Sequence, residues 1–152
     1  MSFRPFNINI ILHLAQGEYY MGKKFRPTIV FDFDGVIHSY ISGWKGVDII
    51  VDPPVKGIKD TIENLQKDYK IVVVSSRCKT REGIEAIISY MAQHKIPYDE
   101  VMAHKPPAIL YIDDRGIQFN GDTKKLLDDI RNFEHWITSS VKKEYMNEEN
   151  SI

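Results

Sequence analysis

The chain has 152 residues, of which 43% are hydrophobic and 27% are charged. This composition is typical of one soluble globular domain with enough apolar residues to bury a core, and it excludes a multidomain machine. A net charge of -1 provides no overall field that would attract nucleic acid or anionic membranes. The single cysteine, Cys78, excludes an internal disulfide framework and favours a reducing compartment, so we predict a cytoplasmic protein. No apolar run approaches the roughly 20 residues that span a bilayer, and we expect no membrane partner.

The first 27 residues differ in character from the rest of the chain. The segment Gly17–Lys24 fits a phosphate-binding loop until its last position, where a lysine replaces the Ser or Thr that binds magnesium, so we reject nucleotide binding there. Codons for Gln16–Glu18 can contain the ribosome-binding sequence AGGAG, and we hypothesise that the natural start is Met21. The predicted parts are an N-terminal extension over 1–27, a folded domain over 28–137 and a polar tail over 138–152.

Four apolar runs from Thr28 onward have the length and the β-branched content of strands. They are Thr28–Phe33, Ile71–Ser75, a short run around Val101, and Ala108–Asp113. Helical patterns separate the first three of these runs, which is typical of βαβ units. The sequence therefore predicts an α/β domain with a mainly parallel sheet.

Three stretches repeat apolar residues at helical spacing. The first contains Val55, Ile58, Ile62 and Leu65, the second Ile84, Ile87, Ile88 and Met91, and the third Leu126, Leu127, Ile130 and Phe133. We expect Asp52–Pro54 to cap and start the first helix, and the second to end before Ile96-Pro97. Gly121-Asp122 precedes the third. The predicted order of elements is β-α-β-α-β-β-α.

Two carboxylates lie at the end of the first predicted strand. Asp32 and Asp34 are two residues apart, so their side chains point to the same side of the strand. Burying two like charges together is costly, and the usual offset is a cation such as Mg²⁺, which prefers oxygen ligands. Gly35 then lets the chain leave the strand sharply without a side chain that blocks the site.

A second acidic pair, Asp113 and Asp114, ends the strand at Ile109–Ile112. Because the carboxyl ends of parallel strands lie on one edge of a sheet, where ligands bind in open α/β folds, we expect the four carboxylates to converge there. Ser75 ends a third strand, and Lys105 lies eight residues before Asp113. The predicted site thus combines acids, a hydroxyl and a cation.

These residues resemble the four ordered motifs of the haloacid dehalogenase-like hydrolase superfamily. The motifs are Asp32–Gly35, Val72–Ser75, Lys105 and Asp113-Asp114, and the match spans residues 28–120. The resemblance implies a three-layer, Rossmann-like sheet with helices on both faces. The Ser75-x-Arg77 spacing is similar to that of small phage and bacterial members and of the phosphatase domain of polynucleotide kinases.

The resemblance implies a phosphohydrolase that works through an aspartyl-phosphate. Asp32 would attack phosphorus as the nucleophile, and Asp34 would protonate the leaving oxygen and later take a proton from water. The implied cofactor is Mg²⁺, held by Asp32, the backbone carbonyl of Asp34, and one or both of Asp113 and Asp114.

Three further residues receive roles through the same resemblance. Ser75 and Lys105 would hold the phosphoryl oxygens, because phosphoryl transfer depends mostly on positioning and charge neutralisation. Arg77 would contact the substrate. His38 flanks the first motif but receives no role, and we expect Trp44 to pack against the core rather than line a pocket.

The loop lengths bear on the substrate. The gap from Val36 to Pro54 has room for a β-hairpin flap with its turn at Ser42–Gly46, and neither this gap nor Ser76–His104 has room for a cap domain. A site without a cap admits a large phosphoester, or a small one if a neighbouring subunit covers the site. A homo-oligomer is therefore one of the alternatives. The basic residues near Arg77 keep a nucleotide or a nucleic-acid end beside small phosphorylated metabolites as substrates.

Two alternatives to hydrolysis use the same residues. The first is a noncatalytic relative that binds a phosphorylated ligand or a protein, and the presence of all four motifs argues against it. The second is a phosphotransferase that passes the phosphoryl group to an acceptor other than water. Product analysis distinguishes the phosphotransferase from the hydrolase.

Overall fold

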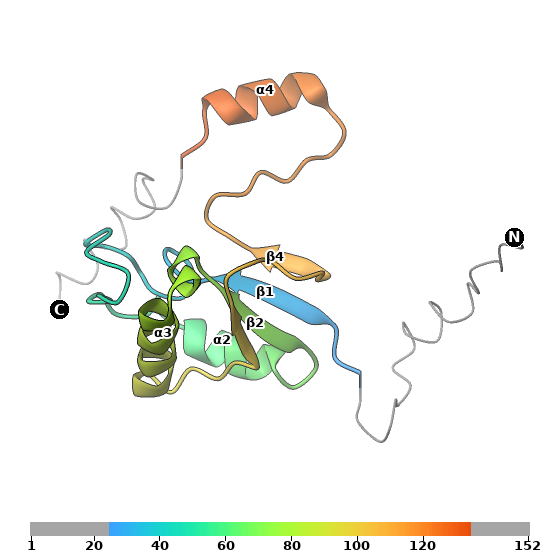
Figure 1. The fold of residues 1–152 in the computed structure, drawn as a ribbon. Coiled ribbons are helices and arrows are strands. Elements are labelled where there is room, and N and C mark those ends of the chain that lie inside the picture. The colour runs from blue at the N-terminus through green and yellow to red at the C-terminus, as the bar shows by residue number, and fades with distance from the viewer. Residues whose placement is uncertain (1–24, 135–152) are drawn as a thin grey trace, which may run out of the picture.

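The computed structural model describes residues 25–134, and Figure 1 shows how its elements are arranged. In chain order they are β1 (Thr28–Asp32), α2 (Ile58–Leu65), β2 (Lys70–Val74), the 3-10 helix η1 (Ser76–Lys79), α3 (Arg81–Gln93), β3 (Glu100–Met102), β4 (Leu110–Ile112) and α4 (Thr123–Arg131). The predicted order of strands and α-helices is confirmed. The proposed start at Met21 and the predicted polar tail over 138–152 lie outside the described residues.

The four strands form one parallel sheet in the order β3-β2-β1-β4. This arrangement confirms the α/β class and the parallel sheet. Because β1 lies between β2 and β4, its carboxyl end is flanked on both sides by the ends of neighbouring strands. Within residues 25–134, no helix is long and apolar enough to cross a membrane.

The main core lies on one face of the sheet. Alternate residues of β1 and β2 point to this face, and α2 and α3 pack on it through Ile62, Ile87 and Met91, each with none of its surface exposed. The opposite face carries a smaller cluster around Val30 and Val72, covered in part by Met102 and Ala108 at the two ends of the β3–β4 connection.

The expectation of helices on both faces of the sheet is not met among the described residues. The connection from β3 to β4 contains no helix, and α4 has no buried residue. In Figure 1, α4 stands apart from the sheet at the end of a long extended stretch. The helix itself begins as predicted, since the side chain of Asp122 accepts hydrogen bonds from the backbone N–H groups of Lys124 and Lys125.

The predicted start of the first helix is wrong. The helix α2 begins after Gly57, which has a positive φ of 78° and provides no side-chain cap. Asp52 instead accepts hydrogen bonds from the backbone N–H and the hydroxyl of Ser42, at 2.8 and 2.6 Å. A tertiary contact across a loop has thus taken the side chain that local sequence rules assigned to the helix.

The predicted β-hairpin after the first motif is present only at its base. His38 and Pro54 form one antiparallel bridge, flanked by bonds from Ser39 N–H to the carbonyl of Pro53 and from Val55 N–H to the carbonyl of Ile37. Residues 39–53, which we call the flap loop, contain no strand. Side-chain hydrogen bonds, rather than a strand ladder, hold this loop in position. Some of these bonds are made by residues of the candidate active site.

Candidate active site

Three carboxylates meet at the carboxyl edge of the sheet. Asp32 is the last residue of β1, and Asp113 and Asp114 directly follow β4. The register pairs Phe31 with Ile112, so the residues after each strand emerge side by side. One carboxylate oxygen from each of Asp32, Asp113 and Asp114 lies within 4.8 Å of the others. The predicted convergence of the two acidic pairs holds for these three residues, which we call the carboxylate cluster.

The electrostatics of Asp32 fit a cation at this cluster. Burial raises the pKa of Asp32 to about 7, with the charges of Asp113, Asp114 and Asp34 adding to the increase. An oxygen-preferring cation such as Mg²⁺ would offset this repulsion and keep the carboxylate of Asp32 ionised. Asp32 and the two acids after β4 are therefore the residues that could hold the metal.

The glycine of the first motif is required by the cluster. Gly35 has a φ of 91°, a conformation that L side chains rarely adopt. A Cβ at this position would lie 2.7 Å from a carboxylate oxygen of Asp114, which is a clash. Gly35 thus allows the side chain of Asp114, only 6% exposed, to come close to the turn after β1.

The predicted phosphate-binding lysine lies beside the cluster. The ammonium of Lys105 forms an ion pair with Asp113, and its side chain remains 49% exposed. The backbone N–H of Arg115 also donates to Asp113, at 2.9 Å. Burial acts to raise the pKa of Asp113, but these hydrogen bonds and charges outweigh it and lower that pKa. Lys105 therefore brings a half-exposed positive charge to the open side of the cluster.

Asp34 lies in a different environment from the cluster. Its carboxylate accepts hydrogen bonds from Nε and Nη2 of Arg77, at 2.8 and 3.1 Å, and lies 2.9 Å from Nδ1 of His38. Burial acts to raise the pKa of Asp34, but these two partners outweigh it and lower that pKa. The carboxylate expected to act as the proton donor is thus hydrogen-bonded to an arginine whose charge favours its ionised form.

Arg77 is completely buried, and its side chain faces the protein rather than solvent. Its Nε and Nη2 bind Asp34, and its Nη1 donates to three carbonyls of the flap loop, those of Gly46, Val47 and Ile49. The ring of Trp44 covers the guanidinium, with its centroid 4.4 Å from the central carbon. In this structure the arginine expected to touch the substrate is occupied entirely by contacts within the chain.

Ser75 is buried and directly follows β2, one residue past the end of the strand rather than at its end as predicted, and its hydroxyl has a local partner. Its Oγ accepts a hydrogen bond from the backbone N–H of Arg77 at 3.2 Å, which caps the helix η1. Gly83 packs so closely on this turn that a Cβ there would lie 2.1 Å from the carbonyl oxygen of Arg77. These contacts fix the backbone from which the arginine side chain extends.

Sequence reasoning missed the roles of His38 and Asp52. His38 is 1% exposed, and its Nε2 accepts a hydrogen bond of 3.3 Å from the backbone N–H of Asp52. Because Nε2 accepts this hydrogen bond, the ring N–H group is at Nδ1, and it donates a hydrogen bond to Asp34. The only sequence signal is the position of His38 four residues after Asp34, and its partner Asp52 is fourteen residues further along.

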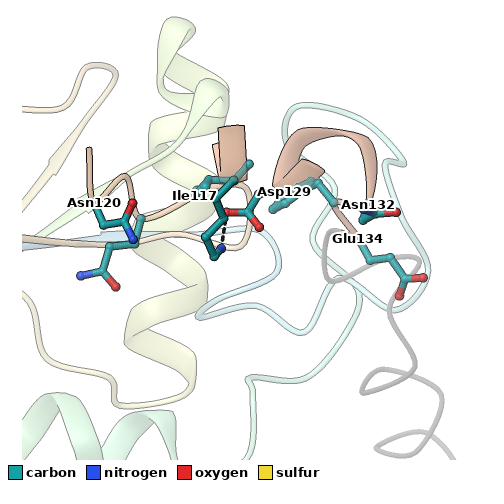
Figure 2. Close-up of a pocket in the computed structure, with 9 residues that line it drawn as sticks. Ile117, Asn120, Asp129, Asn132 and Glu134 are labelled. Atoms are coloured by element: carbon teal, nitrogen blue, oxygen red, sulfur yellow. Dashed lines mark hydrogen bonds and ion pairs between the residues drawn. The ribbon is translucent and has the colours of Figure 1, made fainter. Parts of the chain in front are cut away.

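Two hollows lie on the β4 side of the molecule. One, of about 610 Å³, adjoins the cluster: it is lined by Asp113 of the cluster, by Lys105 and by the half-exposed Tyr111. The other, also about 610 Å³, lies between α4 and the segment before it. Figure 2 shows Ile117 and Asn120 on one side and Asp129 and Asn132 on the other, and no predicted site residue lines this second hollow.

Comparisons with models of known protein families, with curated proteins and with solved structures find no match to this chain. The chain is an α/β protein whose parallel sheet brings Asp32, Asp113 and Asp114 together at its carboxyl edge, with Lys105 beside them.

Proposed function

We propose that this protein is a magnesium-dependent phosphomonoesterase of the haloacid dehalogenase-like type, acting through an aspartyl-phosphate. The observation that carries the proposal is the carboxylate cluster, in which three acids from β1 and β4 share one small volume beside the ammonium of Lys105. Acids that lie so close together repel one another, and such a group fits a site for a divalent cation and a phosphate better than a structural role.

Asp32 is the proposed nucleophile. A carboxylate oxygen of Asp32 attacks phosphorus and forms a P–O bond, while the bond from phosphorus to the substrate alcohol breaks. Water then attacks the phosphorus of the acyl phosphate, which releases inorganic phosphate and restores Asp32. A bound Mg²⁺ at Asp32, Asp113 and Asp114 would supply charge neutralisation for the nucleophile and the phosphoryl oxygens.

Asp34 is the proposed acid and base of the two steps. It gives a proton to the departing alcohol oxygen and takes a proton from the attacking water. Its contacts with Arg77 and His38 favour the ionised form, which suits the second step. For the first step the carboxylate must take up a proton and turn from Arg77 toward the cluster.

Lys105 and Ser75 are the proposed phosphate-binding residues. Lys105 is half exposed beside Asp113, so its ammonium is accessible to an incoming phosphoryl group. Ser75 directly follows β2, beside the carboxyl end of β1. The hollow next to Lys105 offers space for the rest of a nucleotide, a nucleic-acid end or a small phosphorylated metabolite.

Phosphate release tests the proposal. Purified protein is incubated with p-nitrophenyl phosphate and a panel of nucleotides, short 3'-phosphorylated oligonucleotides and sugar phosphates, with Mg²⁺ or with EDTA. We expect turnover that requires Mg²⁺ and that falls by about 1,000-fold or more in Asp32→Asn. Asp128→Asn, the same change at an exposed position on α4, is the matched control and should retain full activity.

The outcomes separate the proposal from its competitors. Release without metal that survives Asp32→Asn contradicts the aspartyl-phosphate mechanism. Phosphate that appears on an added alcohol rather than in solution indicates a phosphotransferase. No release from any panel member, combined with Mg²⁺-dependent binding of phosphorylated ligands, indicates the noncatalytic binding module.

A further inference from the structure

Arg77 joins two parts of the molecule that the proposed function treats separately. One edge of its guanidinium holds the carboxylate of Asp34 through Nε and Nη2. The third nitrogen, Nη1, holds the tip of the flap loop through the carbonyls of Gly46, Val47 and Ile49, at 2.6 to 3.3 Å. A planar guanidinium cannot turn one edge without turning the other, so these two sets of contacts move together.

A second connection links the same carboxylate to the two ends of the flap loop. His38 lies against Asp34 through Nδ1 and accepts the backbone N–H of Asp52 through Nε2. Asp52 in turn accepts both the backbone N–H and the hydroxyl of Ser42, which closes the loop near its beginning and its end. Tyr90 of α3 donates its hydroxyl to the carbonyl of Asp52 at 3.1 Å and ties this connection to the core.

We propose that Arg77 is a positioning residue that couples the conformation of the flap loop to the position of the Asp34 carboxylate. Where the loop tip sits as in this structure, the fork of Arg77 holds Asp34 away from the carboxylate cluster. Displacement of the loop tip removes the three carbonyl acceptors, turns the guanidinium and frees Asp34 to reach the cluster. The role in catalysis rests on the proposed function, whereas the coupling itself does not.

The burial of Arg77 makes the coupling strong. With no exposed surface, its guanidinium has no access to water as a substitute partner. Replacement of Asp34 by asparagine leaves the arginine charge buried without its carboxylate partner, and we expect the arginine side chain to shift toward solvent. The shift breaks the bonds to Gly46, Val47 and Ile49, and the loop tip loosens.

Hydrogen exchange of the backbone amides tests the coupling without any need for activity. Asp34→Asn keeps the shape of the side chain but removes its charge, and Arg77→Lys keeps the charge but removes the fork. In both variants we expect amides of residues 42–51 to exchange at least about tenfold faster than in the wild type. Amides of α2 serve as the internal reference for global unfolding, and Arg81→Lys, an exposed arginine paired with Glu85, is the matched control.

The exchange result either supports or overturns the proposed coupling between the flap loop and Asp34. Faster exchange confined to 42–51 in both variants supports it. Unchanged exchange of this segment in Asp34→Asn and Arg77→Lys overturns it, because the loop would then be held independently of the carboxylate. If Arg77→Lys also raises exchange in α2, Asp34→Asn alone decides, since its side chain is nearly isosteric with the native one.

A leaving-group comparison tests the catalytic part. An alkyl alcohol needs a proton to depart, whereas p-nitrophenolate does not, so a fault in positioning Asp34 penalises alkyl phosphates selectively. We expect Arg77→Lys to lower kcat for an alkyl phosphate by at least about tenfold more than for p-nitrophenyl phosphate. Equal losses on the two substrates overturn the positioning role. An inactive wild type defeats the proposed function and leaves the exchange experiment to judge the coupling.

Discussion

Two sides of the site balance the charges of their carboxylates in opposite ways. The flap side contains Asp34, Arg77 and His38, and the β4 side contains the carboxylate cluster and Lys105. On the flap side, Asp34 is surrounded by a buried arginine and a buried histidine, and its pKa is lowered. On the β4 side, Asp32 faces two further acids, and its pKa is raised to about 7. The flap side carries the counterion of Asp34 within the fold, whereas on the β4 side Lys105 pairs with Asp113. Asp34 therefore has a counterion within the fold, whereas Asp32 has further acids as neighbours, and the proposed Mg²⁺ would act at Asp32.

The largest expected effect follows from removing the internal counterion on the flap side. Arg77→Ala leaves Asp34 partly buried without its arginine, and three flap-loop carbonyls lose their donor. We expect the free energy of unfolding to fall by about 3–5 kcal/mol, as is typical when one partner of a buried ion pair is removed. Urea denaturation followed by circular dichroism measures the change.

The matched change on the β4 side is expected to cost far less. Lys105 is 49% exposed, and its ion pair with Asp113 is screened by water. Lys105→Ala should lower the free energy of unfolding by about 1 kcal/mol or less in the same denaturation experiment. A loss as large as that of Arg77→Ala would show that both sides depend equally on internal ion pairs.

The pH dependence of stability provides the next effect. Without metal, the raised pKa of Asp32 contributes stability below about pH 4, and this contribution is lost as the pH rises through 7. Asp34, with its lowered pKa, contributes stability above about pH 4 that is lost only at more acidic pH. Between pH 4 and 7, Asp32 therefore sets the slope that distinguishes the two sides.

The measurement compares the wild type with Asp32→Asn in EDTA. From pH 4 to 7 we expect the wild type to lose roughly 2–4 kcal/mol of unfolding free energy relative to the variant, whose amide does not titrate. Parallel stability curves for the two proteins over this range would contradict the raised pKa of Asp32.

Magnesium should act on one side of the site only. A ligand that binds only the folded state at 100 times its Kd stabilises that state by about 2.7 kcal/mol, so Mg²⁺ should raise the Tm of the wild type at neutral pH. Asp114→Asn removes one acid of the cluster and should abolish most of this increase. Asp34→Asn changes a side chain outside the cluster and keeps the backbone carbonyl expected to bind the metal, so this variant should retain the increase. A loss of the Mg²⁺ effect in Asp34→Asn would show that both sides share the cation.

The sequence predicted the β4 side of the site better than the flap side, for a physical reason. Asp32, Asp113 and Asp114 end apolar strands, and the parallel order of those strands brings them together. The partners of Arg77 lie 28 to 43 residues away in irregular loop, where no periodicity predicts a contact. His38 likewise finds Asp52 only because the flap loop folds back on its own base.

Local rules failed where tertiary contacts offered a side chain a different partner. Asp52 precedes two prolines and fits a helix start, yet its carboxylate accepts hydrogen bonds from Ser42 and its backbone N–H donates one to His38. The third helix shows the reverse case. Its apolar spacing correctly predicts α4, but the same spacing also predicts a buried face, and no residue of α4 is buried within residues 25–134.

The smallest expected effect concerns α4, which has no buried residue. Ile130 is 57% exposed, and none of the helix is buried, so its apolar side chains contribute little to the free energy of unfolding in this arrangement. Ile130→Gln should change that free energy by no more than about 0.5 kcal/mol in urea denaturation. Ile62→Ala, at a core position with no exposed surface, should lower it by about 2–5 kcal/mol and serves as the reference. A comparable loss of unfolding free energy from Ile130→Gln would mean that α4 packs against a partner surface in solution. The helices α2 and α4 would then not differ in their contribution to stability.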